Sequence, residues 1–274
     1  MPEGPEIRRA ADEVAAAIQG KIATRVTFGL DHLKPMEKLL SGHKVVAVET
    51  HGKAMLTRFE HGQNIYSHNQ LYGRWYTAPT GQRPDISRQL RLSIETADRW
   101  ALLYSASDIA VLPDAALAEH PFLSTLGPDV LDSSVTVETI EARLSSPRYR
   151  NRRLGNFLTE QRFVAGLGNY LRCEILFCSG LAANIRPADL DGAQRHQLAE
   201  NILALPRQSY RTGGITNTLD AARKLLDAGA TFEQARFHVF RRAGKPCYRC
   251  GNTIEKITSG GQACYWCPGC QQTG

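Results

Sequence analysis

The sequence has no apolar run long enough to span a membrane and no export segment at its start. A membrane helix needs about 20 consecutive apolar residues, and the chain of 274 residues contains no such run. Residues 1–5 lack the basic segment followed by an apolar one that marks a secretory signal. Internal repeats and low-complexity segments are also absent. We therefore expect a cytoplasmic protein with no membrane partner.

The chain has fewer acidic than basic residues, and this shortage of acidic residues is confined to its second half. The formal net charge is +6 and the pI is near 9.0. Residues 1–130 hold 14 Lys and Arg against 15 Asp and Glu, whereas residues 131–274 hold 19 against 12, so −1 and +7 make up the +6. A basic half beside a neutral half favours a polyanionic partner, nucleic acid first. A merely soluble surface would give the same composition.

Residues 5–19 have the pattern of an amphipathic helix that begins almost at the start of the chain. Pro5 suits a first helical position, and Gly20 suits a position just beyond the end. One face of this helix is shared by four apolar residues with helical spacing: Ile7, Ala11, Val14 and Ile18. The helix fixes a part of the chain that is ordinarily loose.

The segment from residue 22 to about 105 consists mostly of short strand patterns. Strands are expected at 45–49, 54–59, 89–95 and 101–104. In one of them Leu90, Leu92 and Ile94 alternate with polar residues, the pattern of a half-buried strand. Many short strands with turns between them predict a sandwich or a barrel.

Proline and glycine break up the stretch after residue 106, which we interpret as a linker. Helical patterns follow at 136–145, 151–162, 170–179, 190–204 and 218–228. The last of these patterns makes the stretch 211–236 before the tail longer than we expect. The predicted domains are therefore 1–130, 131–236 and a small metal-binding tail at 237–274.

Five of the seven cysteines lie in the last 28 residues. An odd number of cysteines with CxxC pairs and no export signal favours metal over disulfides. Cys247 and Cys250 form one pair and Cys267 and Cys270 a second, separated by 16 residues, a spacing typical of a structural zinc site. We expect one Zn²⁺ per chain, closed by four thiolates. Cys264 is an alternative ligand, because 264, 267 and 270 are evenly spaced.

Further patterns accompany this tail. Residues 259–261, Ser-Gly-Gly, predict the turn of a β-hairpin between the cysteine pairs. Cys173 and Cys178 are expected to be ordinary buried side chains of a helix.

Two features point to DNA as the polyanion. Residues 148–153 form a dense basic cluster that includes Arg150, and basic side chains supply most sequence-independent DNA affinity. Gly166 and Gly168 then precede Asn169 at the expected start of a helix. Backbone N–H groups at a helix start bind phosphate, and glycine allows a close approach. A solvated basic face with no partner is the alternative.

The start of the sequence offers a nucleophile. Proline at position 2 is small enough for the initiator methionine to be removed, which would leave a secondary amine at Pro2. An α-amino group has a pKa of about 7.7–8, so a useful fraction is unprotonated near neutral pH. Such an amine can attack a sugar C1′ and form a Schiff base. Glu3 and Glu6 lie close by as a general acid or base.

Four segments together resemble the formamidopyrimidine-DNA glycosylase and endonuclease VIII family: Pro2–Glu6, Gly52–Ala54, Gly166–Tyr170 and the four-cysteine tail. The resemblance covers essentially the whole chain. Residues 67–73 and 104–108 are similar to the endonuclease VIII branch, which prefers oxidised pyrimidines. The resemblance implies an α+β multidomain fold. Its parts are an N-terminal antiparallel β-sandwich with the catalytic helix, a C-terminal helix–two-turn–helix domain and a zinc-finger β-hairpin.

The same resemblance implies a bifunctional DNA glycosylase and AP lyase acting on damaged double-stranded DNA in base excision repair. Pro2 would be the Schiff-base nucleophile and Glu3 the general acid/base, while Lys53 would contact phosphate and assist β-elimination. The gap left by the flipped nucleotide would be filled by Gln70, Leu71 and Tyr72. Asn169 would bind a phosphate beside the lesion. Nothing in the sequence demands more than a monomer.

Two positions depart from the family pattern. The tip of the family's finger carries a phosphate-contacting arginine assigned to δ-elimination, and here that position is Gln262. Glutamine donates hydrogen bonds but carries no charge, and charge-assisted bonds are roughly twice as strong. Thr125 stands where the endonuclease VIII branch has a DNA-contacting arginine. These departures make δ-elimination questionable and leave a non-catalytic binder of damaged DNA as the alternative function.

Overall fold

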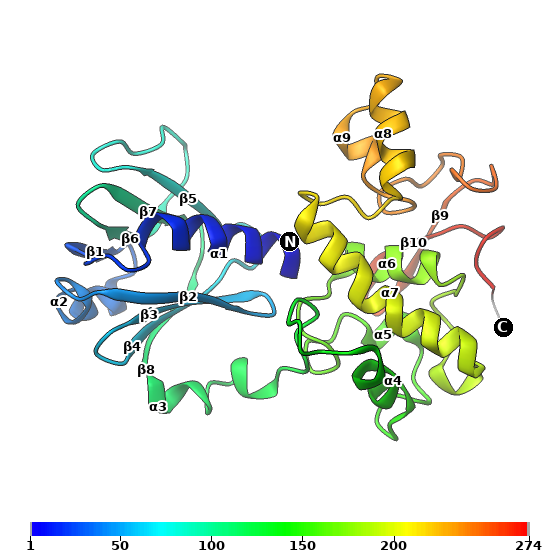
Figure 1. Cartoon of the computed structure of the whole chain (residues 1–274), viewed down its shortest axis with the longest axis horizontal. Coiled ribbons are helices and arrows are strands. Elements are labelled where there is room, and N and C mark those ends of the chain that lie inside the picture. Colours follow the sequence, from blue (N-terminus) through cyan, green and yellow to red (C-terminus); the bar gives the residue numbers. More distant parts are fainter. Residues whose placement is uncertain (1, 273–274) are drawn as a thin grey trace. The chain divides into compact units, whose positions relative to one another are not determined.

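The computed structural model describes residues 2–272, and the chain divides into two compact units, Met1–Thr125 and Leu126–Gly274 (Figure 1). Each unit has a large hydrophobic core cluster of its own.

The first unit is a sandwich of two antiparallel four-stranded sheets. In sheet order, one contains β1 (Arg25–Phe28), β6 (Leu90–Glu95), β7 (Arg99–Tyr104) and β5 (Arg74–Pro79). The other contains β2 (Val45–His51), β3 (Ala54–Phe59), β4 (Gln63–His68) and β8 (Asp108–Pro113). Leu92 and Ile94 of the first sheet share one buried cluster with Met55 and Ile65 of the second. The predicted sandwich is confirmed.

Helix α1 (Gly4–Ile18) contacts strands of both sheets, among them β2 and β5. The four residues of its expected apolar face are all buried. Gly20 follows the helix with φ +79°, and its N–H donates to the Val45 carbonyl at 2.8 Å. The helix predicted at the start of the chain is confirmed, and it is fastened to the sandwich along its buried face and just beyond its end.

Two expectations for the first unit are wrong. Residues 108–113 are not linker but strand β8, an edge strand paired with β4. Pro113 is tolerated there because it closes an edge strand, where a missing N–H breaks no interior ladder. Strand β6 is not half-buried, since Ser93 and Glu95 on its polar face are buried too, and the Ser93 hydroxyl donates to Glu95 Oε1 at 3.0 Å.

Short helical turns complete the first unit. They are η1 (Asp31–Met36), α2 (Glu37–Leu40), α3 (Asp114–Leu117) and η2 (Leu123–Thr125).

The second unit combines helices with a C-terminal hairpin. Its helices are α4 (Val137–Ser145), α5 (Leu154–Phe157), α6 (Asn169–Cys178), η3 (Pro187–Asp189), α7 (Gly192–Arg211), α8 (Leu219–Asp227) and α9 (Phe232–Ala235). Strands β9 (Glu255–Ser259) and β10 (Gln262–Trp266) form the hairpin. Helices and hairpin share one core, because Cys247, Ile254 and Cys264 lie in the same buried cluster as the residues of α6 and α7.

Most expected helices of the second unit are present, but one is much shorter than predicted. Of the residues 151–162 only Leu154–Phe157 are α-helical. The Gly155 N–H donates to the Ala183 carbonyl, and a Cβ at Gly155 would lie 2.3 Å from the Ser259 hydroxyl oxygen. Tertiary contacts therefore set the path of this segment, which a local helical pattern does not reveal.

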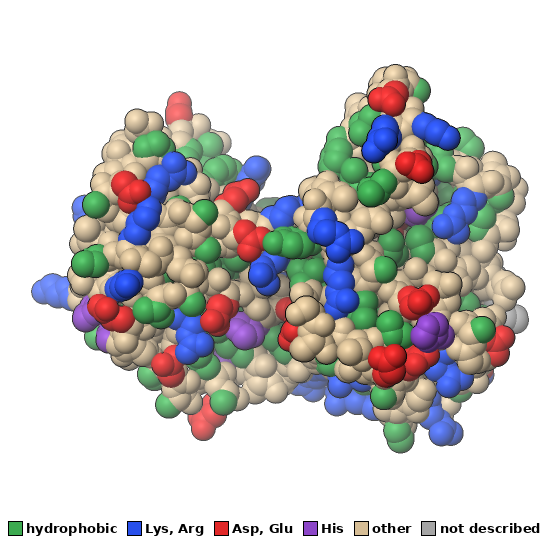
Figure 2. All heavy atoms as spheres, in the orientation of Figure 1, with side chains coloured by type: hydrophobic (Ala, Val, Ile, Leu, Met, Phe, Trp, Pro, Cys, Tyr) green, Lys and Arg blue, Asp and Glu red, His purple; other side chains and the backbone are tan. Residues whose placement is uncertain are grey.

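Helices α8 and α9 lie in the stretch that is longer than expected. Figure 2 shows hydrophobic side chains exposed over the part that Figure 1 labels α8 and α9, and Leu219, Leu226 and Phe232 are 48%, 39% and 41% exposed. Among the residues that the structure describes, no helix is both long and apolar enough to cross a membrane.

Candidate active site and nucleic-acid interface

Residues 2–6 are fixed by the first turn of α1. Glu3 precedes the helix and is 3% exposed. Its backbone N–H donates to Glu6 Oε2 at 3.0 Å, and Glu6 Oε1 accepts from Arg9 at 3.3 Å. The carboxylate of Glu6 is thus oriented from both sides, and a buried carboxylate directly follows Pro2 in the chain.

Lys53 lies in the turn between β2 and β3, next to Gly52 at φ +61°. Its side chain is buried, and burial lowers the pKa of its ammonium group, while the charges of Glu3 and Glu6 oppose that shift. Burial favours the neutral amine of Lys53 and the two carboxylates favour its charged form, so opposing effects act on its protonation, and perturbed groups of this kind are frequent at functional sites. The structure therefore brings together Glu3, Glu6 and Lys53, the three ionisable residues predicted from the sequence.

A pocket of about 410 Å³ opens beside the start of α1. Its walls include Pro2, Glu6, Arg9 and Glu13 from the first turns of the helix, and Asn69, Leu71, Tyr72 and Arg88 from the loops that face it. Three of these residues, Arg9, Glu13 and Arg88, were not predicted from the sequence. Helical spacing from Glu6 could have identified the first two, but nothing local predicts Arg88.

The loop between β4 and β5 presents apolar side chains to solvent. Leu71 is 58% and Tyr72 is 71% exposed. Gln70 has φ +50°, a left-handed conformation that costs a non-glycine residue energy and usually serves a function where it persists. Gly73 ends the loop, and a Cβ there would lie 2.6 Å from the Asn69 carbonyl oxygen. The three residues predicted to fill the DNA gap thus share one tight loop.

Three hydrogen bonds hold this loop in place. The Ser107 hydroxyl donates to Gln70 Oε1 at 3.1 Å, and the Gln70 N–H donates to His68 Nδ1 at 3.1 Å. Arg88 donates to the Tyr72 carbonyl at 2.7 Å. Exposed apolar side chains on a preformed loop can enter a base stack without first being ordered.

In the second unit, the turn before α6 is shaped by one side-chain amide. Gln161 Nε2 donates to the Leu167 carbonyl at 2.8 Å, and its Oε1 accepts from the Gly166 N–H at 3.0 Å. Gly166 has φ +99°, Gly168 is the N-cap of α6, and Asn169 is its first residue. The turn expected at this helix start is present, and Gln161 shapes it although no local sequence signal predicts that role.

The basic cluster at residues 148–153 is only partly free for a ligand. Arg152 is paired with Glu160. Tyr149 is buried, and the guanidinium groups of Arg143 and Arg148 lie 5.9 and 5.6 Å from its ring centre. Arg150 is exposed, and no ion pair involves its side chain within the described part of the chain. Arg153 is likewise exposed without an ion pair among the described residues, so Arg150 and Arg153 are the members of the cluster that are accessible to a phosphate.

The two residues that depart from the family pattern are engaged differently. The Thr125 hydroxyl is used locally, since it donates to the Phe122 carbonyl at 3.0 Å. Gln262 is exposed at the start of β10, directly after the predicted turn, where Gly260 and Gly261 have φ +56° and +74°. The uncharged amide thus stands on the hairpin tip.

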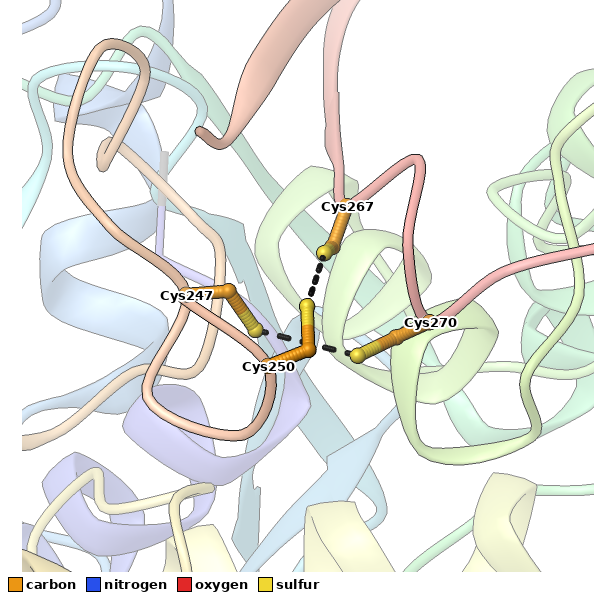
Figure 3. Close-up of side chains that lie close together, drawn as sticks. All are labelled: Cys247, Cys250, Cys267 and Cys270. Carbon is orange, nitrogen blue, oxygen red and sulfur yellow. Dashed lines mark hydrogen bonds between the residues drawn. The ribbon is translucent and has the colours of Figure 1, made fainter. Parts of the chain in front are cut away.

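The sulfur atoms of Cys247, Cys250, Cys267 and Cys270 converge (Figure 3), all within 4.8 Å of one another. Two of the separations are 3.8 Å between Cys247 and Cys270 and 3.4 Å between Cys250 and Cys267. Four thiol ligands at this spacing fit one tetrahedral metal ion.

Cys264 lies outside this cluster. Its sulfur is 3.9 Å from that of Cys173, and both residues are buried. The CxxC pairs therefore form the candidate metal site, as expected, and the choice between Cys264 and the later cysteines is settled for the described residues. Cys173 is buried as predicted, whereas Cys178 is only half-buried.

Two family models match the chain: the formamidopyrimidine-DNA glycosylase N-terminal domain over residues 1–107, and the formamidopyrimidine-DNA glycosylase H2TH domain over residues 126–220. Endonuclease 8 of Escherichia coli (strain K12 / DH10B) is 51% identical over 271 residues, covering 99% of this chain and 100% of that protein. Endonuclease 8 of Salmonella arizonae is 50% identical over 272 residues, with the same coverage.

Solved structures agree on the fold. Lactococcus lactis Fpg (MutM) in complex with DNA containing an oxidised pyrimidine has a TM-score of 0.81 at 19% identity, covering 99% of this chain and 100% of that one. The same protein in complex with DNA containing an abasic site has a TM-score of 0.81 at 20% identity, with the same coverage.

Proposed function

The chain belongs to the formamidopyrimidine-DNA glycosylase family, and we propose that it is a bifunctional DNA glycosylase and AP lyase of the Endonuclease 8 type that removes oxidised pyrimidines from duplex DNA. Identity of 51% to Endonuclease 8 along nearly the whole chain supports the activity. The observation that carries the chemistry is the pocket at the start of α1, which Pro2 and Glu6 line together. The negative charge of Glu6 also acts on the ammonium group of Lys53.

In this proposal the amine of Pro2 attacks C1′ of the damaged nucleotide after Met1 has been removed. A nitrogen–carbon bond forms at C1′, and the glycosidic bond breaks, its electron pair leaving with the base, which takes up a proton. The sugar ring opens to an imine, with Glu3 as the general acid and base of these steps. Base excision itself therefore needs no attack of water on the sugar.

The imine then promotes strand cleavage. It withdraws electrons and acidifies the C2′ proton, and loss of that proton expels the 3′ phosphate in β-elimination. Lys53 contacts a phosphate and assists this step, and Glu6 orients the Glu3 backbone. Hydrolysis of the imine finally releases Pro2. Burial lowers the pKa of Lys53, which favours its taking part in proton transfer.

Base extrusion and DNA binding fall to the other predicted residues. Extruding a nucleotide costs a few kcal/mol, less when the base is damaged. Gln70, Leu71 and Tyr72 offset part of that cost by filling the gap. Asn169, next to Gly168, and the exposed Arg150 bind phosphate.

We further propose that Zn²⁺ occupies the four-cysteine cluster in a purely structural role. Four thiolates leave no open position for a substrate. The ion stabilises the hairpin that carries Gln262, and chemistry at the sugar does not pass through it. Because Gln262 and Thr125 carry no charge, β-elimination is the last efficient step and δ-elimination is weak.

The remaining organisation follows from these assignments. We assign catalysis to 1–130, helix–two-turn–helix binding to 131–236 and finger binding to 237–274. A monomer working on the chromosome in the bacterial cytoplasm suffices for the whole reaction.

Borohydride trapping tests the proposal. Borohydride reduces an imine to a stable amine and so fixes the enzyme to the DNA. We expect a covalent species on a duplex with one oxidised pyrimidine and on an abasic duplex, with the linkage at Pro2. Trapping on abasic DNA alone would leave a lyase without base excision. If a protein lacking Met1 binds both duplexes and traps on neither, the non-catalytic damaged-DNA binder is the correct function.

A further inference from the structure

Arg172 of α6 is the largest fully buried side chain of the described residues, with 0% exposure. Its four hydrogen bonds within residues 2–272 all go to neutral oxygen atoms. They run to the carbonyls of Gly155 at 2.7 Å, Ser259 at 3.0 Å and Ala263 at 3.3 Å, and to Asn169 Oδ1 at 2.6 Å. No carboxylate contacts its guanidinium group within residues 2–272.

A buried guanidinium without an acidic partner is unfavourable in the free protein, since its charge has left water and met no counter-charge. The neighbouring Glu174 does not compensate it, because that carboxylate accepts from the backbone N–H groups of Val239 and Phe240. The charge of Arg172 therefore remains available to an anion that binds at the surface nearby, and duplex DNA is such an anion.

The contact with Asn169 fixes the orientation of its amide. Arginine has only donors, so the atom that faces Arg172 must be the amide oxygen. The Nδ2 group of Asn169 then points away from Arg172 and has no hydrogen-bond partner among the described residues. Asn169 is half-buried at the first position of α6, so a donor is offered where the resemblance implies a phosphate.

The same guanidinium holds the hairpin tip. Ser259 ends β9 and Ala263 follows Gln262 at the start of β10, and the carbonyls of these two residues are the acceptors. A Cβ at Gly260 would be 3.6 Å from Arg172 Nη1, so the turn lies directly against the guanidinium. Asn169 and Gln262, two proposed phosphate contacts about 90 residues apart in sequence, are thus both positioned by the guanidinium group of Arg172.

We propose that Arg172 is the positioning residue of phosphate binding in the second unit. It orients the Asn169 amide donor outward, holds the turn that bears Gln262, and supplies from beneath the surface the positive charge that the uncharged tip lacks. This inference rests on the proposed function, because Asn169 and Gln262 are taken as DNA contacts.

The test compares binding with chemistry in the full-length protein. The probe is a duplex with a tetrahydrofuran abasic analogue, and its Kd is measured by fluorescence anisotropy from 50 to 300 mM KCl. Borohydride trapping at saturating protein reports the chemistry. The variants are R172M, R172K, N169A and the double variant R172M/N169A. R186M is the matched control, because Arg186 is already paired with Asp189.

R172M should raise the Kd by about 10- to 100-fold and lower the salt dependence by about one phosphate contact. Its trapping rate at saturation should stay within about threefold of the wild type, because the sugar chemistry lies elsewhere. R172K keeps the charge but not the planar fork, so it should keep the salt dependence and lose part of the affinity. The Kd of R172M/N169A should be at most about threefold higher than that of whichever single variant binds more weakly, because Arg172 acts through Asn169. R186M should bind as the wild type does.

Folding is checked by bound zinc and by the melting temperature. If R172M does not fold, N169D carries the test, since it retains Arg172 and gives it a carboxylate partner. N169D should be at least as stable as the wild type and bind at least tenfold more weakly, because a carboxylate oxygen replaces the outward donor. Wild-type affinity in folded R172M, or in N169D, overturns the inference while wild-type trapping leaves the function intact. A wild type that neither binds nor traps overturns both.

Discussion

Both units hold a side-chain amide by its oxygen, but with different donors. In the first unit the Ser107 hydroxyl bonds Gln70 on an exposed loop. In the second, the buried Arg172 bonds Asn169. A hydroxyl can donate or accept, whereas a guanidinium only donates. The Gln70 amide can therefore reverse to suit what it meets, and the Asn169 amide cannot.

This difference matches the two proposed roles. Every phosphate presents acceptor oxygens, so the residue that binds it needs one fixed orientation. A base opposite a lesion varies in its donors and acceptors, so the residue beside it gains from a reversible one. The two units also differ in their proposed contributions to the reaction. We assign the chemistry to α1 of the first unit, and affinity to the buried contacts and the candidate zinc site of the second.

This division between chemistry and affinity is tested most severely by Pro2→Gly. We expect trapping on an oxidised-pyrimidine duplex to fall by about 100-fold or more, because the nucleophile changes. The Kd for the abasic-analogue duplex should stay within about twofold, because the second unit is untouched. Gel trapping and anisotropy measure the two effects, and intact mass confirms that Met1 is absent. Full excision by this variant would remove Pro2 from the mechanism.

Metal removal tests the second unit alone. Cys247 and Cys267 belong to its core, so losing the ion should disorder the hairpin and expose that core. We expect Cys250→Ser to lose bound zinc and to bind the abasic-analogue duplex about 30-fold more weakly, a loss of roughly 2 kcal/mol. Zinc is measured by a colorimetric release assay and binding by anisotropy. Cys178→Ser, outside the cluster, is the control and should match the wild type; a zinc-free Cys250→Ser that binds normally contradicts the structural role.

Ser107→Ala should have a smaller effect. It removes the hydrogen bond to Gln70, worth about 1 kcal/mol, from a residue in a left-handed conformation. We expect about fivefold weaker binding of the abasic-analogue duplex and no change for undamaged DNA. In a Gln70→Ala background the same substitution should have no further effect. An equal loss in both backgrounds would mean that Ser107 does not act through Gln70.

Gln262→Arg should have the smallest effect, and mainly on the products of cleavage. An arginine on the hairpin tip adds a charge-assisted phosphate contact. We expect the fraction of δ-elimination product on abasic DNA to rise about two- to threefold, as measured on a denaturing gel. An unchanged product ratio would assign that step to another residue.

Much of this protein could be predicted from its sequence because the signals are local. The spacing of Ile7, Ala11 and Val14 predicted α1, and the paired CxxC motifs predicted the four-cysteine cluster that the structure brings together. Family membership and fold class are confirmed by the matching family models. The roles of Pro2, Glu3, Lys53, Gln70 and Asn169 stay predictions.

The wrong expectations share one physical reason, which is that contacts with distant segments of the chain override the local sequence pattern. Pro113 favours a linker when the sequence is considered alone. It is compatible with strand β8 because this strand lies at the edge of the sheet beside β4, and that position depends on the tertiary structure. Only Leu154–Phe157 of the predicted helix 151–162 are helical, because Gly155 lies against Ala183 and Ser259.

The sequence by itself determined the helix at the start of the chain, the sandwich and the four-cysteine cluster, and it named the residues to which the chemistry is assigned, because each depends on spacing or residue type. Only the tertiary structure decided that Lys53 is buried beside two carboxylates and that Cys264 faces Cys173. It alone decided that Arg172 lies beneath Asn169 and the hairpin tip. Burial and contacts between distant segments are set by how elements pack, and no periodicity along a single chain encodes them.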